Sequence, residues 1–264
     1  MINTETNIKT KQQAEEKDVL DNKLLAEMAE AGVLQGHKKS KTHPRMKPYV
    51  AVNRHGLDIF DARAVIDSLR KSVAFLKEVI SKNGLVIFVG TTPPAKRSIK
   101  NLAEELNQPY VITRWVGGTI TNFKIIRKRI DYYEELKAKK ESGELEKYTK
   151  KEQVKFTKEI ERLAQKFDGL VRLTRRPDAF FIIDALEHDT AIREAKHMGI
   201  PLLAIIDNDD NPDLIDYPII ASDHSRLGIE WIMNRIKSEI LPRPTSPLAK
   251  SKAGGNSKSE TNPK

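Results

Sequence analysis

The residues of this sequence with the clearest chemical potential are cations gathered in one short segment. Between positions 37 and 54 the chain carries no acidic residue and six basic ones: Lys38, Lys39, Lys41, Arg45, Lys47 and Arg54. Six like charges on one folded loop repel one another, and the phosphates of a polyanion would neutralise them. We therefore predict that this basic segment, residues 37–54, binds the backbone of a nucleic acid.

A second candidate contact region surrounds a turn near the middle of the chain. Arg114 and Trp115 precede Gly117-Gly118, where the backbone can be approached closely. The indole ring could stack on a base, or it could simply pack beneath the helix that follows. The other predicted nucleic-acid contacts are Lys96, Arg97, Asn122, Lys124, Arg127 and Lys128. We expect the basic segments to form one cationic pole of the molecule.

An acidic run offers carboxylates that could hold a hard cation. Residues 207–213 contain four Asp, but Pro212 stands where a calcium-binding loop of the EF-hand type needs glycine. His37 and His43 could join such a site, although the neighbouring lysines would repel a metal ion. We expect a solvated turn whose Asp and Asn side chains bond their own backbone, and no metal.

A turn that could bind a small nucleotide follows a predicted strand at Gly90. It lacks both the glycine and lysine spacing of a P-loop and the three glycines of a dinucleotide-binding turn. No spacing of Ser, His and Asp supports a catalytic triad, because fold geometry rather than sequence distance sets triads. We predict no catalytic residue and no cofactor.

Overall composition agrees with a partner that carries negative charge. The 264 residues have a net charge of +9 and a sequence pI of about 9.5. There is no cysteine, which excludes disulfides, cysteine-ligated zinc and a thiol nucleophile. The apolar runs are too short to span a bilayer, and the first residues lack the apolar core of a signal peptide. We therefore expect a soluble cytoplasmic protein with no membrane contact.

Alternating strands and helices must position these residues. Apolar runs predict strands at 85–89, 109–112, 179–183 and 200–206, and apolar residues at helical spacing predict helices at 21–31, 61–82, 95–106, 190–198 and 225–240. This order predicts an α/β fold with a doubly wound parallel sheet. Residues 49–52 and 57–60 should form a β-hairpin, and residues 36–48 an irregular, extended basic loop.

An inserted helical hairpin is predicted between the two halves of the sheet. Residues 124–167 carry two narrow apolar stripes, which indicate an antiparallel coiled coil. Thr149 and Glu152 have the spacing of a capping box, and Thr121 and Asn122 should cap the first helix. The predicted α/β domain is therefore discontinuous, with residues 19–123 and 168–241. The segments 1–18 and 242–264 are predicted to be disordered tails, the second one basic.

Four stretches resemble, in order, the signatures of the bacterial small-subunit ribosomal protein 2 family. They are Glu30–His37, Pro44–Tyr49, Arg114–Phe123 and Asn211–Ile219, within a resemblance that spans about residues 24–240. The chain departs from the family pattern at Thr42-His43, where Trp-Asn is usual, and at residues 208–211, which are more acidic and lack the usual cysteine.

This resemblance implies a flavodoxin-like sheet with a coiled-coil insertion, no enzymatic activity and no cofactor. It also implies small-subunit ribosomal RNA and other small-subunit ribosomal proteins as partners, with ribosomal protein 1 among them in some bacteria, and no homo-oligomer. We therefore expect a structural constituent of the small ribosomal subunit, needed for its assembly and for translation. The alternatives are an α/β enzyme that binds a nucleotide at the Gly90 turn and a metal at the Asp207 loop, and a protein adaptor that works through residues 124–167.

Overall fold

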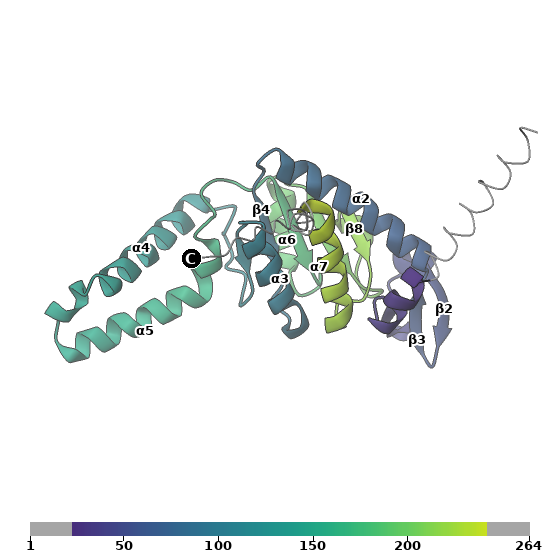
Figure 1. The fold of residues 1–264 in the computed structure, drawn as a ribbon, viewed down its shortest axis with the longest axis horizontal. Coiled ribbons are helices and arrows are strands. Elements are labelled where there is room, and N and C mark those ends of the chain that lie inside the picture. The colour runs from purple at the N-terminus through teal and green to yellow at the C-terminus, as the bar shows by residue number, and fades with distance from the viewer. Residues whose placement is uncertain (1–22, 242–264) are drawn as a thin grey trace, which may run out of the picture.

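A computed structural model of the chain describes residues 23–241 (Figure 1). The predicted tails at 1–18 and 242–264 lie outside the described residues. Residues 23–30 are helical, in agreement with the prediction for 21–31, and the chain turns at Gly32 with a φ of 72°. Among the described residues, no helix has the length and apolar character needed to cross a membrane.

A five-stranded parallel sheet forms the centre of the molecule. Its order is β5-β4-β6-β7-β8, with every neighbouring pair parallel. The strands are β4 (Val86–Val89), β5 (Tyr110–Val111), β6 (Ala179–Ile183), β7 (Leu202–Ile206) and β8 (Tyr217–Ile220). Every residue of β4, β6 and β7 is buried, which explains why these strands are apolar without alternation. The predicted α/β class is confirmed.

Helices cover this sheet. They are α2 (Ala62–Ser81), α3 (Pro93–Glu105), α6 (Asp189–His197) and α7 (Arg226–Ile240). In Figure 1, α3 and α7 lie side by side, and α2 packs along α7 and β8. Helix α3 begins two residues before the predicted position because Pro93 occupies its first turn, where a missing N–H costs nothing.

Strand β8 is an element that sequence reasoning missed. It pairs with β7 at the edge of the sheet and contains Pro218. Proline cannot donate a backbone hydrogen bond, so it is confined to edge strands, and it hides the strand signal of its neighbours. On the side that faces α2, the carbonyl of Tyr217 accepts a hydrogen bond from the Ser72 hydroxyl, at 3.2 Å.

A second, antiparallel sheet contains the two ends of the basic segment. Its order is β1-β3-β2, with β1 at Gln35–Lys38, β2 at Val50–Arg54 and β3 at Leu57–Phe60. The predicted β-hairpin is therefore confirmed. Its two-residue turn places His55 at φ 52° and Gly56 at φ 82°, as a turn of type I′ requires.

The irregular loop predicted for residues 36–48 is wrong. Strand β1 takes its first residues, and two 3-10 helices follow, η1 (Lys39–Lys41) and η2 (Pro44–Tyr49). The backbone N–H of Arg45 donates to His43 Nδ1 at 3.3 Å, and Met46 of η2 is fully buried. Short 3-10 turns and a strand defined by its partner leave no apolar period in the sequence, which is why the segment looked irregular.

Two long helices, α4 (Phe123–Glu141) and α5 (Lys150–Phe167), project from one end of the sheet (Figure 1). We call this element the helical hairpin. The predicted apolar residues of α4 are all buried: Ile126, Ile130, Tyr133 and Leu136. Helix α5 buries Ile160, Leu163 and Phe167. The Glu152 carboxylate accepts from the N–H of Thr149 at 3.0 Å, so the predicted capping box is confirmed.

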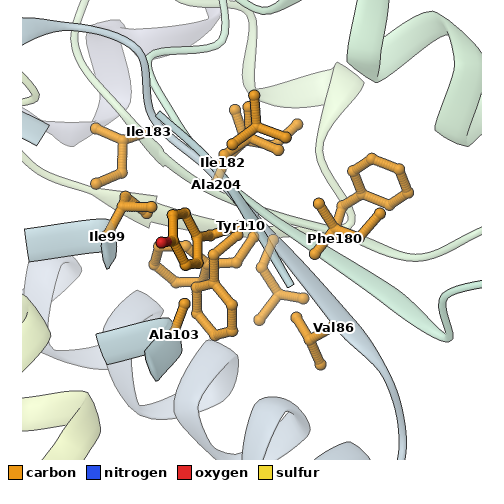
Figure 2. Packing of buried hydrophobic residues seen from close by; sticks show 14 of the residues in the cluster. Val86, Ile99, Ala103, Tyr110, Phe180, Ile182, Ile183 and Ala204 are labelled. Carbon is orange, nitrogen blue, oxygen red and sulfur yellow. The ribbon is translucent and has the colours of Figure 1, made fainter. Parts of the chain in front are cut away.

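The core runs continuously from the sheet into the flanking helices. Figure 2 shows Tyr110 of β5 beside Ile99 and Ala103 of α3. Within the sheet, the rings of Phe88 and Phe181 have centroids 5.3 Å apart. This packing fixes the carboxyl ends of the strands, where Arg114 follows β5 and the acidic run follows β7.

Candidate nucleic-acid interface

The six cations of the basic segment are all exposed on the small sheet and its 3-10 helices. Within the described residues, only Arg45 among them forms an ion pair. Its Nε lies 3.2 Å from Asp213 Oδ2, and both side chains are more than half exposed, so solvent screens the interaction. The segment therefore presents largely uncompensated positive charge to solvent.

A buried polar network holds the basic segment in place, and Asn208 is its centre. The Asn208 side chain accepts from the N–H of His37 at 2.7 Å and donates to the carbonyl of His37 at 3.2 Å. It also donates to Thr42 Oγ1 at 2.8 Å, and the backbone carbonyl of Asn208 accepts from the N–H of His43 at 2.7 Å. Asn208 thus ties β1 to the segment that follows it.

Asp58 completes this network from strand β3. It is almost fully buried and accepts hydrogen bonds from Thr42, Asn53 and Asn208. Burial raises the pKa of Asp58, but these three hydrogen bonds outweigh burial and hold the pKa below its usual value. The carboxylate is therefore charged at neutral pH, on the inner side of a surface whose outer side is cationic.

The turn around Arg114 is built on a carboxylate that sequence reasoning missed. Glu194 of α6 is almost fully buried and accepts from the indole N–H of Trp115 at 3.0 Å. It also accepts the backbone N–H groups of Gly118, Ile120 and Thr121 at 2.8, 3.1 and 3.2 Å. Burial raises the pKa of Glu194, but these hydrogen bonds lower it by more, so the net shift is downward.

The predicted caps of the first hairpin helix are wrong. Asn122 occupies the N-cap position of α4, yet its side chain accepts no capping hydrogen bond. Its backbone carbonyl accepts from the N–H of Ile125 instead, at 3.0 Å. The Thr121 hydroxyl is directed to Glu194, at 3.1 Å, because the buried carboxylate is the stronger acceptor. Of the two adjacent glycines, Gly118 has the positive φ, 85°.

Trp115 and Arg114 have different environments. The Trp115 side chain is half-buried, and its ring lies against Phe180 of β6 with centroids 5.8 Å apart. With its N–H bonded to Glu194, the indole packs the joint between the sheet and the helical hairpin. Arg114 is exposed. Arg114 therefore remains available to a partner, and Trp115 has a structural task.

The cations predicted on the first hairpin helix are also of two kinds. Lys124 and Lys128 are exposed. Arg127 pairs with Asp131 and Glu134, both at 2.6 Å, and donates to the carbonyl of Val171 at 3.1 Å. Its guanidinium therefore fastens the base of the helical hairpin.

The Gly90 turn is packed rather than open. A Cβ at Gly90 would lie 2.7 Å from Ile99 and 3.1 Å from Ala95, so glycine allows α3 to approach the sheet. The N–H of Thr91 donates to His188 Nε2 at 3.3 Å. The turn thus uses its space and a donor internally, which disfavours a bound nucleotide. Lys96 and Arg97 are exposed on α3 just beyond it.

The structure does not gather the basic segments into one cationic pole, so that expectation is wrong. The strands β2 and β3 and the helical hairpin lie at opposite ends of the molecule, with the five-stranded sheet between them (Figure 1). Positions along the sequence do not show this separation of the two basic regions, because it depends on which strands lie at the edges of the five-stranded sheet. The molecule presents two separate basic ends.

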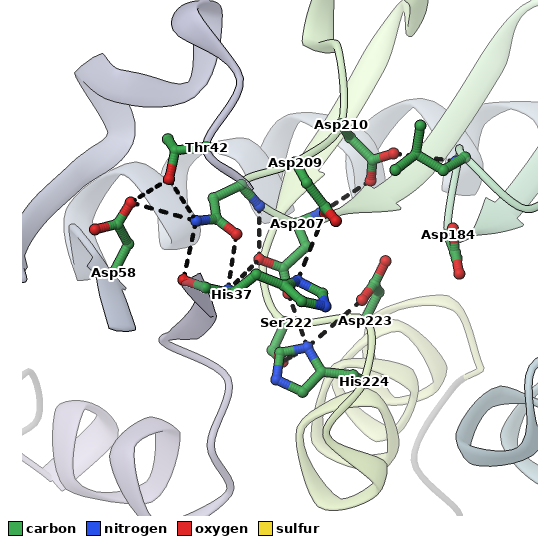
Figure 3. Close-up of polar contacts among 12 residues, drawn as sticks. His37, Thr42, Asp58, Asp184, Asp207, Asp209, Asp210, Ser222, Asp223 and His224 are labelled. Carbon is green, nitrogen blue, oxygen red and sulfur yellow. Dashed lines mark hydrogen bonds and ion pairs between the residues drawn. The ribbon is translucent and has the colours of Figure 1, made fainter. Parts of the chain in front are cut away.

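The first part of the acidic run, residues 207–210, is largely buried, which corrects the expected solvated turn. Asp207 and Asn208 are fully buried, and Asp210 is 1% exposed. Asp210 does bond nearby backbone, accepting from the N–H of Asp207 at 3.1 Å, but it also accepts from Leu186 at 3.1 Å. The run is buried because the strand β1 and residues 222–224 cover it (Figure 3).

Two histidines lie against this run. His224 Nδ1 is 3.0 Å from Asp207 Oδ2, and His37 Nδ1 is 3.3 Å from the same oxygen. The hydrogen bond to Asp207 and the nearby Asp223 raise the pKa of His224 to about 10. Burial raises the pKa of Asp223 to about 6 and that of Asp210 to about 8. The sequence pointed to His37 as a possible ligand, but His224 and Asp223 were missed. His43 lies outside the cluster, as the N-cap residue of η2.

These features define an α/β protein with two exposed basic ends and, within the described residues, a buried cluster of Asp207, Asp210 and Asp223 next to β1. The sequence also matches a known family over most of its length. The family model described as ribosomal protein S2 matches residues 28–241. The chain belongs to this family.

Curated relatives agree with that assignment. The chain is 39% identical to the small ribosomal subunit protein uS2 of Coprothermobacter proteolyticus, over 82% of this chain and 81% of the relative. The proteins of the same name from Thermus thermophilus and Dehalococcoides mccartyi are 38% and 36% identical, over 82% of this chain and 85% and 89% of theirs.

Proposed function

We propose that this chain is a structural constituent of the small ribosomal subunit that binds ribosomal RNA and has no catalytic role. Its family and the names of its relatives support a ribosomal function. The observation that carries RNA binding is the basic segment, whose exposed cations lie on the small sheet and its 3-10 helices and are held by the Asn208 network. A rigid cationic surface loses little conformational entropy when it binds phosphates.

The finer features of the fold fit the same proposal. Counted from β4, the sheet has the order 2-1-3-4-5, which is that of flavodoxin-like folds. We take residues 19–123 and 168–241 as one such domain and residues 124–167 as a coiled-coil insertion. The narrow buried stripes of α4 and α5 support this division.

The RNA contacts are proposed at both ends of the molecule. At one end they are Lys38, Lys39, Lys41, Arg45, Lys47 and Arg54. At the other they are Arg114, Lys124 and Lys128, with Lys96 and Arg97 on α3 between the two ends. Asn122, Trp115 and Arg127 lie at the same end as Arg114. Trp115 and Arg127 act mainly by holding the base of the helical hairpin against the sheet. Neighbouring ribosomal proteins, including ribosomal protein 1 in some bacteria, would contact the remaining surface. The chain would act as a single copy, without forming a homo-oligomer, in the cytoplasm.

Incorporation into subunits tests this proposal. Lys38, Lys39 and Lys41 are replaced together by alanine, and co-sedimentation with small subunits is measured before and after a salt wash. A matched control replaces Lys71, Lys77 and Lys196, which are also exposed but lie on α2 and α6. We expect the first variant to be lost from subunits in the salt wash and the control to remain. Equal retention of both variants would contradict RNA binding by the basic segment.

A further inference from the structure

The two histidines and the acidic run form a cluster that ribosomal RNA binding does not use. His37 comes from β1, Asp207 follows β7, and Asp223 and His224 follow β8 (Figure 3). One side-chain nitrogen or oxygen from each of the four residues lies within 4.8 Å of the others. Three segments far apart in the sequence therefore direct metal-ligating atoms to one point.

Three separations between these atoms are close to those expected around a tetrahedral zinc ion. Bonds of roughly 2.0–2.1 Å from zinc to nitrogen or oxygen place neighbouring ligand atoms about 3.3 Å apart. His37 Nδ1 is 3.3 Å from Asp207 Oδ2, and His224 Nδ1 is 3.0 Å from the same oxygen. His224 Nδ1 is 3.7 Å from Asp223 Oδ1. Three contacts between ligand atoms thus fall close to the edge length of one coordination tetrahedron.

His37 supplies a second observation. Its Nδ1 is buried and has no hydrogen-bond partner, although Asp207 Oδ2 and Asp209 Oδ1 are only 3.3 and 3.5 Å away. The distances would allow a hydrogen bond, but the directions do not. The rings of His37 and His224 also lie close together, with centroids 4.5 Å apart, so one cation would contact both imidazoles. Neutral imidazoles whose lone pairs share one cation would satisfy both nitrogens.

We propose that His37, Asp207, Asp223 and His224 bind one Zn²⁺ ion. Two carboxylates balance the charge of the ion, and two neutral imidazoles complete the four ligands of a closed structural site. Because the chain has no cysteine, a structural zinc site would have to use these ligand types.

The surroundings of the cluster hold the ligands in position. Asp207 Oδ1 accepts the N–H of Asn208 at 2.6 Å, which leaves Oδ2 directed to the histidines. Ser222 Oγ lies 3.4 Å from His224 Nε2, the ring nitrogen that would not face the metal. Asp207 is fully buried, and the Asp223 side chain is 8% exposed. Such supporting contacts orient the ligands and are typical of protein metal sites.

A metal ion here would fasten the basic segment to the main sheet. Strand β1 ends at Lys38, immediately before the cations of η1, and β7 and β8 belong to the five-stranded sheet. Joining His37 to Asp207, Asp223 and His224 would therefore restrict the same end of the molecule that the Asn208 network holds.

Metal analysis of the full-length chain tests the site. The purified chain is equilibrated with Zn²⁺, dialysed against metal-free buffer, and its zinc content and thermal midpoint are measured. We expect about one zinc ion per chain and a midpoint that falls when EDTA is added, since a metal that binds only the folded state stabilises it. The variant H224Q should retain no more zinc than the buffer. His224 is partly exposed, so this variant is expected to fold.

The variant H197Q provides the matched control, because His197 is exposed on α6 and away from the cluster. It should bind zinc as the wild-type chain does. Cobalt in place of zinc should give the visible absorption of a tetrahedral ion in the wild-type chain and in H197Q, and not in H224Q or in a second variant, D223N. A wild-type chain without retained zinc, or equal zinc in H224Q and H197Q, would overturn the proposal.

Discussion

The two ends of the molecule are both basic, but they carry their charge differently. Between residues 124 and 166 the helical hairpin has fourteen basic and nine acidic residues, and several are paired, as in Arg127 with Glu134, Lys139 with Glu135 and Arg162 with Glu159. The basic segment has six cations and no acid. Net charge alone would make the two ends similar, whereas the structure makes the basic segment the surface with less compensated positive charge.

The ends are also fastened by different chemistry. A buried, charged carboxylate, Glu194, holds the turn that leads into the helical hairpin. A buried neutral amide, Asn208, holds the basic segment. Removing either group would leave buried donors without acceptors, but the carboxylate serves more of them. The comparison therefore predicts unequal costs.

The largest effect is expected for Glu194→Ala. This change leaves three backbone N–H groups and an indole N–H without their acceptor, and we expect a loss of about 3–5 kcal/mol in the free energy of unfolding. Chemical denaturation of the full chain measures it. A loss below that of Asn208→Ala would reverse the ranking of the two ends.

A smaller loss, about 2–3 kcal/mol, is expected for Asn208→Ala, because the hydrogen bonds that it removes involve neutral groups or are shared with Asp58 and Thr42. Hydrogen exchange should also increase at the amide of His37, which donates to the Asn208 side chain. Unchanged exchange at this amide would show that the Asn208 side chain does not hold the basic segment.

Acid should weaken the hairpin end through Glu194. The folded-state pKa of Glu194 lies below the ordinary value of 4.5, so its charge contributes stability that is complete above pH 4.5 and is lost as the pH falls through the folded pKa. The difference in unfolding free energy between wild type and Glu194→Gln should therefore be constant near neutral pH and narrow in acid. A difference that widens in acid would contradict this sign.

The smallest effect is expected for Lys124 and Lys128 changed together to alanine. Acidic residues on the same helical hairpin already offset much of its positive electrostatic potential. We therefore expect RNA affinity to fall by about threefold or less at moderate salt. A filter-binding assay with small-subunit ribosomal RNA measures this change. A loss as large as that for the basic segment would make the two ends equivalent.

Sequence reasoning succeeded where one element carries its own signal. The apolar runs of β4, β6 and β7, the buried stripe of α4 and the capping box at Thr149 all lie within short windows. It failed at β8, because Pro218 hides an edge strand, and at β1, whose strand character comes from pairing with β3.

The polar centres were harder to predict because they join distant positions. Glu194 meets residues more than 70 positions earlier in the chain, and His37 meets Asn208 across 171 positions. An acidic residue between the apolar positions of a predicted helix was the available signal for Glu194. For His224 the only signal was its place beside Asp223, since the approach to Asp207 depends on the pairing of β7 with β8.

The central claim is that the basic segment is the main phosphate-binding surface, and the salt dependence of RNA binding tests it most directly. The affinity of the full chain for small-subunit ribosomal RNA is measured across salt concentrations, for wild type and for the alanine variant of Lys38, Lys39 and Lys41. We predict that log K falls steeply with log salt in wild type. The slope should be shallower by about 2–3 in the variant, at roughly 0.7–0.9 for each phosphate that is no longer neutralised. A variant whose log K falls with log salt as steeply as that of the wild-type chain would contradict the claim.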